Sequence, residues 1–262
     1  MALGSQPRWT VRSADAQVGI DVGLRDYMLR VYNYMASGLA LTGIVAYVAA
    51  ASGFYESIAR TPLIWLVILA PLGLVMLMSF GVQRMQASTL QMVFWLYAGL
   101  MGLSLAMVFL VFTGASVARV FFITAGTFAA MSVYGYTTQR DLSQFGSFLF
   151  MGLIGIIIAS LVNMFLASSA LQFAISVIGV VVFTGLTAWD TQQIKEMYYE
   201  GDGSEIAGKK AIMGALRLYL DFINLFMMLM QLLGTRRDCS RKPTERSPER
   251  PGLAPGRFLC GS

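Results

Sequence analysis

Two aspartates stand in stretches of sequence that are otherwise apolar. Asp221 lies within LRLYLDFINLF, residues 216–226, and Asp190 lies within TGLTAWDTQQIKEMY, residues 184–198. Two carboxyl groups held together in an apolar interior share one proton more readily than both ionise. With both protons lost, they present the oxygen ligands that suit a hard cation such as calcium. These residue types therefore predict a pH sensor that can also bind a cation.

Further polar residues are placed to act with the aspartates. Arg217, Asn224 and Gln231 share one face of a helix with Asp221, because their spacings fit 3.6 residues per turn. A helix that is buried in a bundle, or that lines a cavity, gathers its polar groups in this way. Polar contacts that only join helices together would explain Asn224 and Gln231 equally well. Arg84, at the end of another apolar run, is the candidate for a cationic latch on the two carboxylates.

The elements that carry these residues are membrane spans. The chain has 262 residues, of which 56% are hydrophobic and 13% are charged, whereas soluble domains carry about 25% charged residues. A spanning helix needs roughly 20 apolar residues. We expect seven spans, at residues 31–52, 62–82, 90–112, 118–136, 144–165, 170–189 and 211–233. The fold class predicted is an all-α integral membrane protein, with no cleaved signal peptide because the first 30 residues are polar.

The distribution of basic residues favours a cytoplasmic N-terminus. Among basic residues, the outside loops between spans then carry only Arg60 and Arg119. The inside segments carry Arg8, Arg12, Arg25, Arg30, Arg84, Arg140, Lys195, Lys209 and Lys210. The basic C-terminal tail argues against this topology, and six spans with a re-entrant seventh segment would keep both ends inside. With the N-terminus inside, Asp190, Asp221 and Arg84 all belong to the cytoplasmic half, with Asp221 about 15 Å into the last span.

Several function classes are excluded by composition. The chain has no histidine, and its two cysteines, Cys239 and Cys260, both lie in the tail. Histidine-based metal sites and Ser-His or Cys-His catalysis are therefore absent. An intramembrane aspartyl protease needs a Gly-x-Gly-Asp turn, but Leu218 precedes Asp221 where the first glycine would stand. We expect no enzyme, no cofactor and no resident metal. The net charge of +5 indicates topology and anionic lipid rather than nucleic acid.

Four stretches of the chain resemble the bacterial branch of the Bax inhibitor-1 family. The most specific is ALRLYLDFINLFMMLMQLLG, residues 215–234, which is similar to the last helix of that family. The string TAWDTQQI, residues 187–194, resembles the end of span 6. Residues 30–50 and 140–165 resemble spans 1 and 5. The resemblance covers about residues 30–233.

The resemblance implies a bundle in which six helices surround a central seventh. It also implies a pH-sensitive calcium leak channel of the inner membrane, with Asp190 and Asp221 as the sensor and Arg84 near the end of span 2. Other bacterial members resemble modulators of a membrane-bound AAA protease, which act through a cytoplasmic N-terminal tail. We therefore expect a polar tail at residues 1–30, a membrane domain at 31–234 and a basic, proline-rich, disordered tail at 235–262. Calcium, the lipid bilayer and an AAA protease are the partners implied.

Overall fold

The structure, a computed structural model, describes residues 9–237, and it describes side chains from residue 22 onward. This part of the chain is helical, as predicted, and its only β-type pairing is an isolated bridge. The helices are α1 (Trp9–Ala51), α2 (Phe54–Ala59), α3 (Leu63–Gly81), α4 (Ala87–Val111), α5 (Gly114–Thr137), α6 (Ser143–Leu166), α7 (Ser169–Glu196) and α8 (Ser204–Leu233).

Seven of these helices are long and apolar enough to cross a bilayer, which confirms the predicted number of spans. The differences lie at their ends. α7 continues to Glu196 and α8 already begins at Ser204, because a helix can extend beyond the apolar stretch that marks its span. The short helix α2 lies between two spans and was not predicted, since six residues give no periodic signal. α8 is a single helix of 30 residues, which is the form of a complete span rather than of a re-entrant segment.

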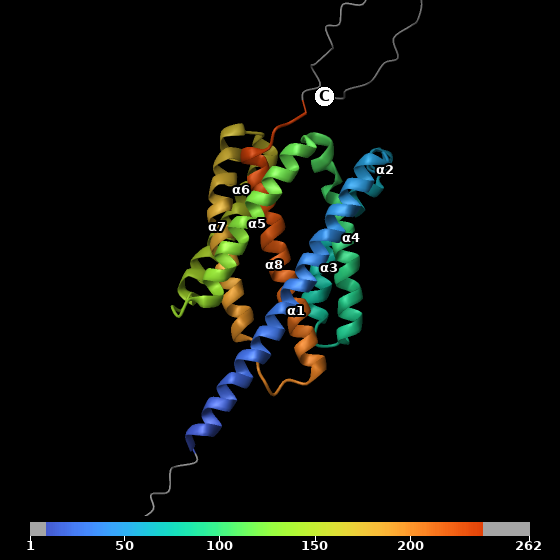
Figure 1. The fold of residues 1–262 in the computed structure, drawn as a ribbon. Helices are drawn as coiled ribbons and strands as arrows, with labels where there is room; N and C mark the ends of the chain where they lie inside the picture. Colours follow the sequence, from blue (N-terminus) through green and yellow to red (C-terminus); the bar gives the residue numbers. More distant parts are fainter. Residues whose placement is uncertain (1–8, 238–262) are drawn as a thin grey trace, which may run out of the picture.

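α8 is the central helix of the bundle (Figure 1). In its apolar window 67% of the residues are buried, against 11% to 39% in the other six spans. α1, α4, α5 and α7 pack directly against it, while α3 packs on α4 and α6 packs on α7 from outside. The expected arrangement is therefore present, with four helices in direct contact with the seventh and two completing the bundle.

Glycines bring two pairs of helices unusually close together. A Cβ atom at Gly135 of α5 would lie 2.2 Å from the carbonyl oxygen of Ala188 on α7. A Cβ atom at Gly102 of α4 would lie 2.6 Å from the carbonyl oxygen of Thr42 on α1. Small residues at such crossings let helix backbones approach within a membrane. The first of these contacts fixes α7 two residues before Asp190.

Local structure is present at both of the expected domain limits. Residues 9–30 are helical and continuous with the first span, so no helix boundary occurs at residue 30. The backbone of residues 235–237 pairs antiparallel with the α4–α5 connection, through a bridge between Phe112 and Arg236. The rest of the predicted C-terminal tail, including both cysteines, lies outside the described residues.

Candidate functional site

Asp190 and Asp221 lie together in the interior, on neighbouring helices. Asp190 is six residues before the end of α7, and Asp221 is near the middle of α8. Their residues are 9% and 5% exposed, respectively. The two carboxyl groups lie close enough to interact. Two carboxyl groups can form a hydrogen bond only when one carries a proton that the other accepts. We call these two residues the aspartate pair.

One cation faces the aspartate pair in the described part of the chain. Nη1 of Arg217 lies 4.0 Å from Oδ1 of Asp190. The arginine side chain is 46% exposed, so its guanidinium reaches the carboxylate from the edge of the bundle. The buried Oδ2 of Asp221 has no hydrogen-bond partner among the described residues. A buried carboxyl oxygen without a donor is costly, so this group gains most from keeping a proton within the pair.

Arg84 is not brought to the aspartate pair. It is exposed in the turn that follows α3, and α3 packs against α4 rather than against α8. Among the described side chains, Arg84 forms no ion pair with either aspartate. From the sequence, we expected Arg217 on the supporting polar face and Arg84 as the latch. In the structure, Arg217 makes the carboxylate contact that was expected of Arg84.

The other two residues of the predicted polar face lie farther along α8. Oε1 of Gln231 accepts hydrogen bonds from Oγ of Ser176, at 2.7 Å, and from Nε2 of Gln172. Gln172 in turn accepts from Nδ2 of Asn163 at 2.8 Å, which joins α6 to the same group. Asn224 is half-buried, and its side chain makes no hydrogen bond within the described residues. Gln231 therefore joins helices at the other end of the bundle and does not touch the aspartate pair.

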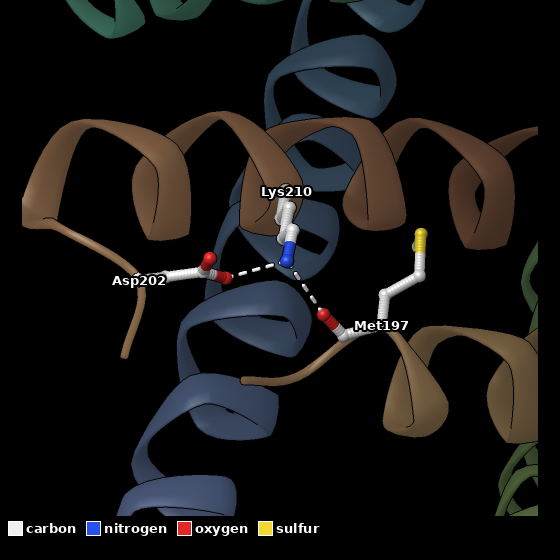
Figure 2. A network of polar contacts seen from close by, with 3 residues as sticks. All are labelled: Met197, Asp202 and Lys210. Carbon is white, nitrogen blue, oxygen red and sulfur yellow. Dashed lines mark hydrogen bonds and ion pairs between the residues drawn. The ribbon is translucent and has the colours of Figure 1, made fainter. Parts of the chain in front are cut away.

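The loop between α7 and α8 is fixed by one lysine (Figure 2). Nζ of Lys210 donates to the carbonyl oxygen of Met197, at 2.9 Å, and to the carboxylate of Asp202. Met197 is the C-terminal cap of α7, where carbonyl oxygens lack helical partners and a cation is favourable. The contact sets the position of α8 against α7 at the loop between them, where Met197 follows Asp190 by seven residues.

A chain of hydroxyl groups beside the aspartate pair was not predicted from the sequence. Oη of Tyr32 lies 2.6 Å from Oγ of Ser132, which lies 3.0 Å from Oγ1 of Thr191. Thr191 donates to the carbonyl oxygen of Thr187. Its oxygen must then accept from Ser132, and Ser132 must accept from Tyr32, since each hydroxyl has one proton. The chain joins α1, α5 and α7, and common hydroxyl residues give no sequence signal for it.

The site has few groups that could hold a metal permanently. Across the described residues no group of three or more histidine, cysteine, aspartate or glutamate side chains is placed to bind a metal ion. The aspartate pair alone supplies two carboxyl groups. Calcium takes six to eight oxygen ligands in a lasting site.

Comparison with known proteins places the chain in a family. The sequence model described as "Inhibitor of apoptosis-promoting Bax1" matches residues 24–238. The chain belongs to the Bax inhibitor family. The match includes all seven membrane spans and the aspartate pair, and it begins inside α1.

Bacterial relatives of this Bax inhibitor protein are similar over nearly their whole length. Protein RP147 of Rickettsia prowazekii is 52% identical over 87% of this chain and 98% of its own. Inner membrane protein YbhL of Escherichia coli K12 is 49% identical over 86% of this chain and 97% of its own. Membrane protein SpyM3_0260 of Streptococcus pyogenes is 32% identical over 82% of this chain and 94% of its own. With its seven apolar helices, the chain is a multi-pass protein of the inner membrane.

Proposed function

We propose that this Bax inhibitor family member is a pH-sensitive leak channel for calcium or a similar cation, gated by the aspartate pair. The observation that carries the proposal is the burial of two carboxyl groups on helices that pack together, Asp190 on α7 and Asp221 on the central helix. Titration of these groups changes the charge between two helices that pack along each other. The resemblance of both aspartate motifs to the family's sensor supports the same function.

The electrostatics of the aspartate pair supply a gating force. With one shared proton the pair carries a single negative charge, which Arg217 faces at 4.0 Å. A second proton removes that charge and weakens the attraction to the guanidinium. Loss of the last proton leaves two like charges in a low-dielectric interior, which favours separation of α7 from α8 or uptake of a cation. Either change alters the contact of the central helix with its neighbour.

The test is calcium flux into proteoliposomes that contain an indicator dye, measured between about pH 5 and pH 8, a range that brackets a carboxyl pair with a shared proton. The parent is compared with Asp190→Asn, Asp221→Asn and the double variant. Asparagine keeps the shape of the side chain and removes its titration. We expect pH-dependent flux from the parent and a flat profile from the double variant.

Asp141→Asn is the matched control. This carboxylate is fully exposed, and the Ser143 side chain and backbone N–H hydrogen-bond to it, which holds its pKa below the ordinary value. Asp141 therefore stays ionised throughout the pH range of the assay, and its removal should leave the profile unchanged. A folded double variant that retains the parent's pH profile would refute the gating role of the aspartate pair.

A second function is favoured by the N-terminal part of α1. This helix begins at Trp9, whereas its apolar span begins only at Val22, and its first turns extend away from the bundle (Figure 1). An exposed helical arm suits the restraint of a membrane-bound AAA protease, which some family members resemble in function. If this is the role, deletion of residues 1–20 abolishes the effect on proteolysis in cells, while Asp221→Asn retains it. If folded parent protein gives no calcium flux, restraint of the protease replaces the leak channel as the proposed function.

A further inference from the structure

α1 and α5 flank a long lateral groove on the bundle. Two adjoining cavities, of about 580 Å³ and about 260 Å³, lie between these helices and share Leu39 in their walls. α1 does not pack along α5 as it packs along α4 and α8. The smaller cavity reaches the central helix at Phe222, directly after Asp221 in the sequence. The larger cavity lies toward the N-terminal end of α1.

The larger cavity is apolar along its length and basic at one end. Its walls include Arg25, Met28 and Leu39 of α1 and Phe128, Ala129 and Tyr136 of α5. Arg25 is the charged member of this set. Tyr32 and Ser132 hydrogen-bond to each other from opposite walls of the groove.

A second cation lies near the same end. Nζ of Lys195 lies 5.3 Å from the centre of the Tyr136 ring, which lines the groove together with Arg25. Neither Arg25 nor Lys195 forms an ion pair within the described residues. The basic end is also the end of the bundle at which α1 enters it (Figure 1). An anionic group seated there would meet positive charge that no described carboxylate neutralises.

The groove is longer than the hydrocarbon thickness of one leaflet of a bilayer. Arg25 and Leu39 are separated by 14 residues of α1, which corresponds to about 21 Å of helix. One leaflet contributes about half of the roughly 30 Å hydrocarbon core. A chain from that leaflet can therefore lie along the apolar walls while its headgroup remains beside Arg25. Basic pockets between membrane helices are typical binding places for anionic headgroups.

We propose that this α1–α5 groove binds one phospholipid with an anionic headgroup. Its phosphate lies against Arg25, and one acyl chain runs between Met28 and Leu39 of α1 and the facing residues of α5. The occupant is a lipid of the surrounding bilayer, since the groove opens sideways between two spanning helices. The site is independent of the leak-channel proposal and holds whichever function the aspartate pair performs.

The test uses the full chain in nanodiscs of zwitterionic lipid that contain a small fraction of phosphatidylglycerol with a photoreactive group in its acyl chain. After illumination, labelled peptides are mapped by mass spectrometry. We expect labelling to concentrate in residues 25–39 and 128–136. Ala129→Phe fills the groove and should remove most of this labelling. Ala130→Phe is the matched control, because Ala130 is also exposed on α5 but does not line the cavity.

The headgroup is tested separately. Arg25→Gln should lower labelling by phosphatidylglycerol about fivefold, the effect of one interfacial cation on an anionic lipid. Labelling by a photoreactive phosphatidylcholine should stay unchanged. Arg30→Gln removes an exposed arginine of the same helix that does not line the groove, and it serves as the control. Labelling spread evenly over α3 and α6, or insensitive to Ala129→Phe, would show bulk lipid only and overturn the proposal.

Discussion

Replacement of Gly135 by alanine tests the helix crossing that positions Asp190. The new Cβ atom would lie 2.2 Å from the carbonyl oxygen of Ala188 and 2.9 Å from its carbonyl carbon. Ordinary contacts begin near 3.4 Å, so α5 and α7 must move apart by on the order of 1 Å. Overpacking of this kind costs about 1 to 3 kcal/mol. The better helix propensity of alanine offsets at most ~1 kcal/mol of that cost.

Gly126→Ala provides the comparison on the same helix. A Cβ atom at Gly126 meets nothing within 4 Å, so this variant gains helix propensity without a clash. Thermal unfolding in mild detergent, followed by the fraction that remains monodisperse, gives the two midpoints. We expect the midpoint of Gly135→Ala to fall several degrees below that of Gly126→Ala. Equal midpoints would show that α5 and α7 do not approach as closely as described, and the position derived for Asp190 would lose its support.

Two further substitutions test the contacts around α8. Arg217→Gln should raise the pH midpoint of calcium flux by up to about one unit, because a nearby cation favours the ionised carboxylate, whereas Arg84→Gln should leave it in place. A midpoint that moved only in the Arg84 variant would restore the latch to that residue. Lys210→Met should lower the free energy of unfolding by about 1 kcal/mol. Lys209→Met loses a surface ion pair with Glu205 at 3.5 Å, and it should lower the free energy of unfolding by only about 0.3 kcal/mol. Equal losses of unfolding free energy in the two variants would contradict the role of the α7–α8 loop contact.

The spans were predictable because the bilayer imposes a simple rule on composition. Long charge-free runs identify the helices, and the concentration of polar residues on one face of the last run indicated that it is buried. The ends of the helices were less predictable. α7 continues through TQQIKE, where polar residues carry no hydropathy signal, and its end is set by Met197 and Lys210 instead. The sequence places that lysine in the chain but cannot show which carbonyl oxygen it reaches.

The aspartate pair and its cation show what topology can and cannot predict. Asp190 and Asp221 were expected together because consecutive spans carry them in the same half of the membrane. The same reasoning about depth placed Arg84 with them, but depth says nothing about lateral position. α3 packs on α4 rather than on α8, so Arg84 forms no ion pair with the aspartate pair among the described side chains. Arg217 carried a usable signal, since it precedes Asp221 by four residues and shares its helix face.

The register between α7 and α8 explains which polar residues meet. Lys210 of α8 contacts the carbonyl of Met197 at the end of α7. Arg217 follows Lys210 by seven residues, and it contacts Asp190, which precedes Met197 by seven residues. Gln231 follows Arg217 by fourteen residues on α8, and it contacts Ser176, which precedes Asp190 by fourteen residues on α7. Steps of seven residues keep one seam between antiparallel helices in contact, as in coiled coils. The seam residues of α8 are Lys210, Arg217, Asn224 and Gln231.

The same register explains why Asn224 has no polar partner on α7, and it limits the form of gating that the site allows. Asn224 is opposite Phe183 by this count, which explains why its side chain has no polar partner on α7. The contacts at the two ends of the seam join Lys210 to the backbone carbonyl of Met197 and Gln231 to the hydroxyl of Ser176. The aspartate pair, which the proposal assigns to pH sensing, lies between them. Under the proposed function, a change of pH therefore acts on the centre of α8 while both ends stay attached to α7, so gating requires bending or rotation of the central segment rather than translation of the whole helix.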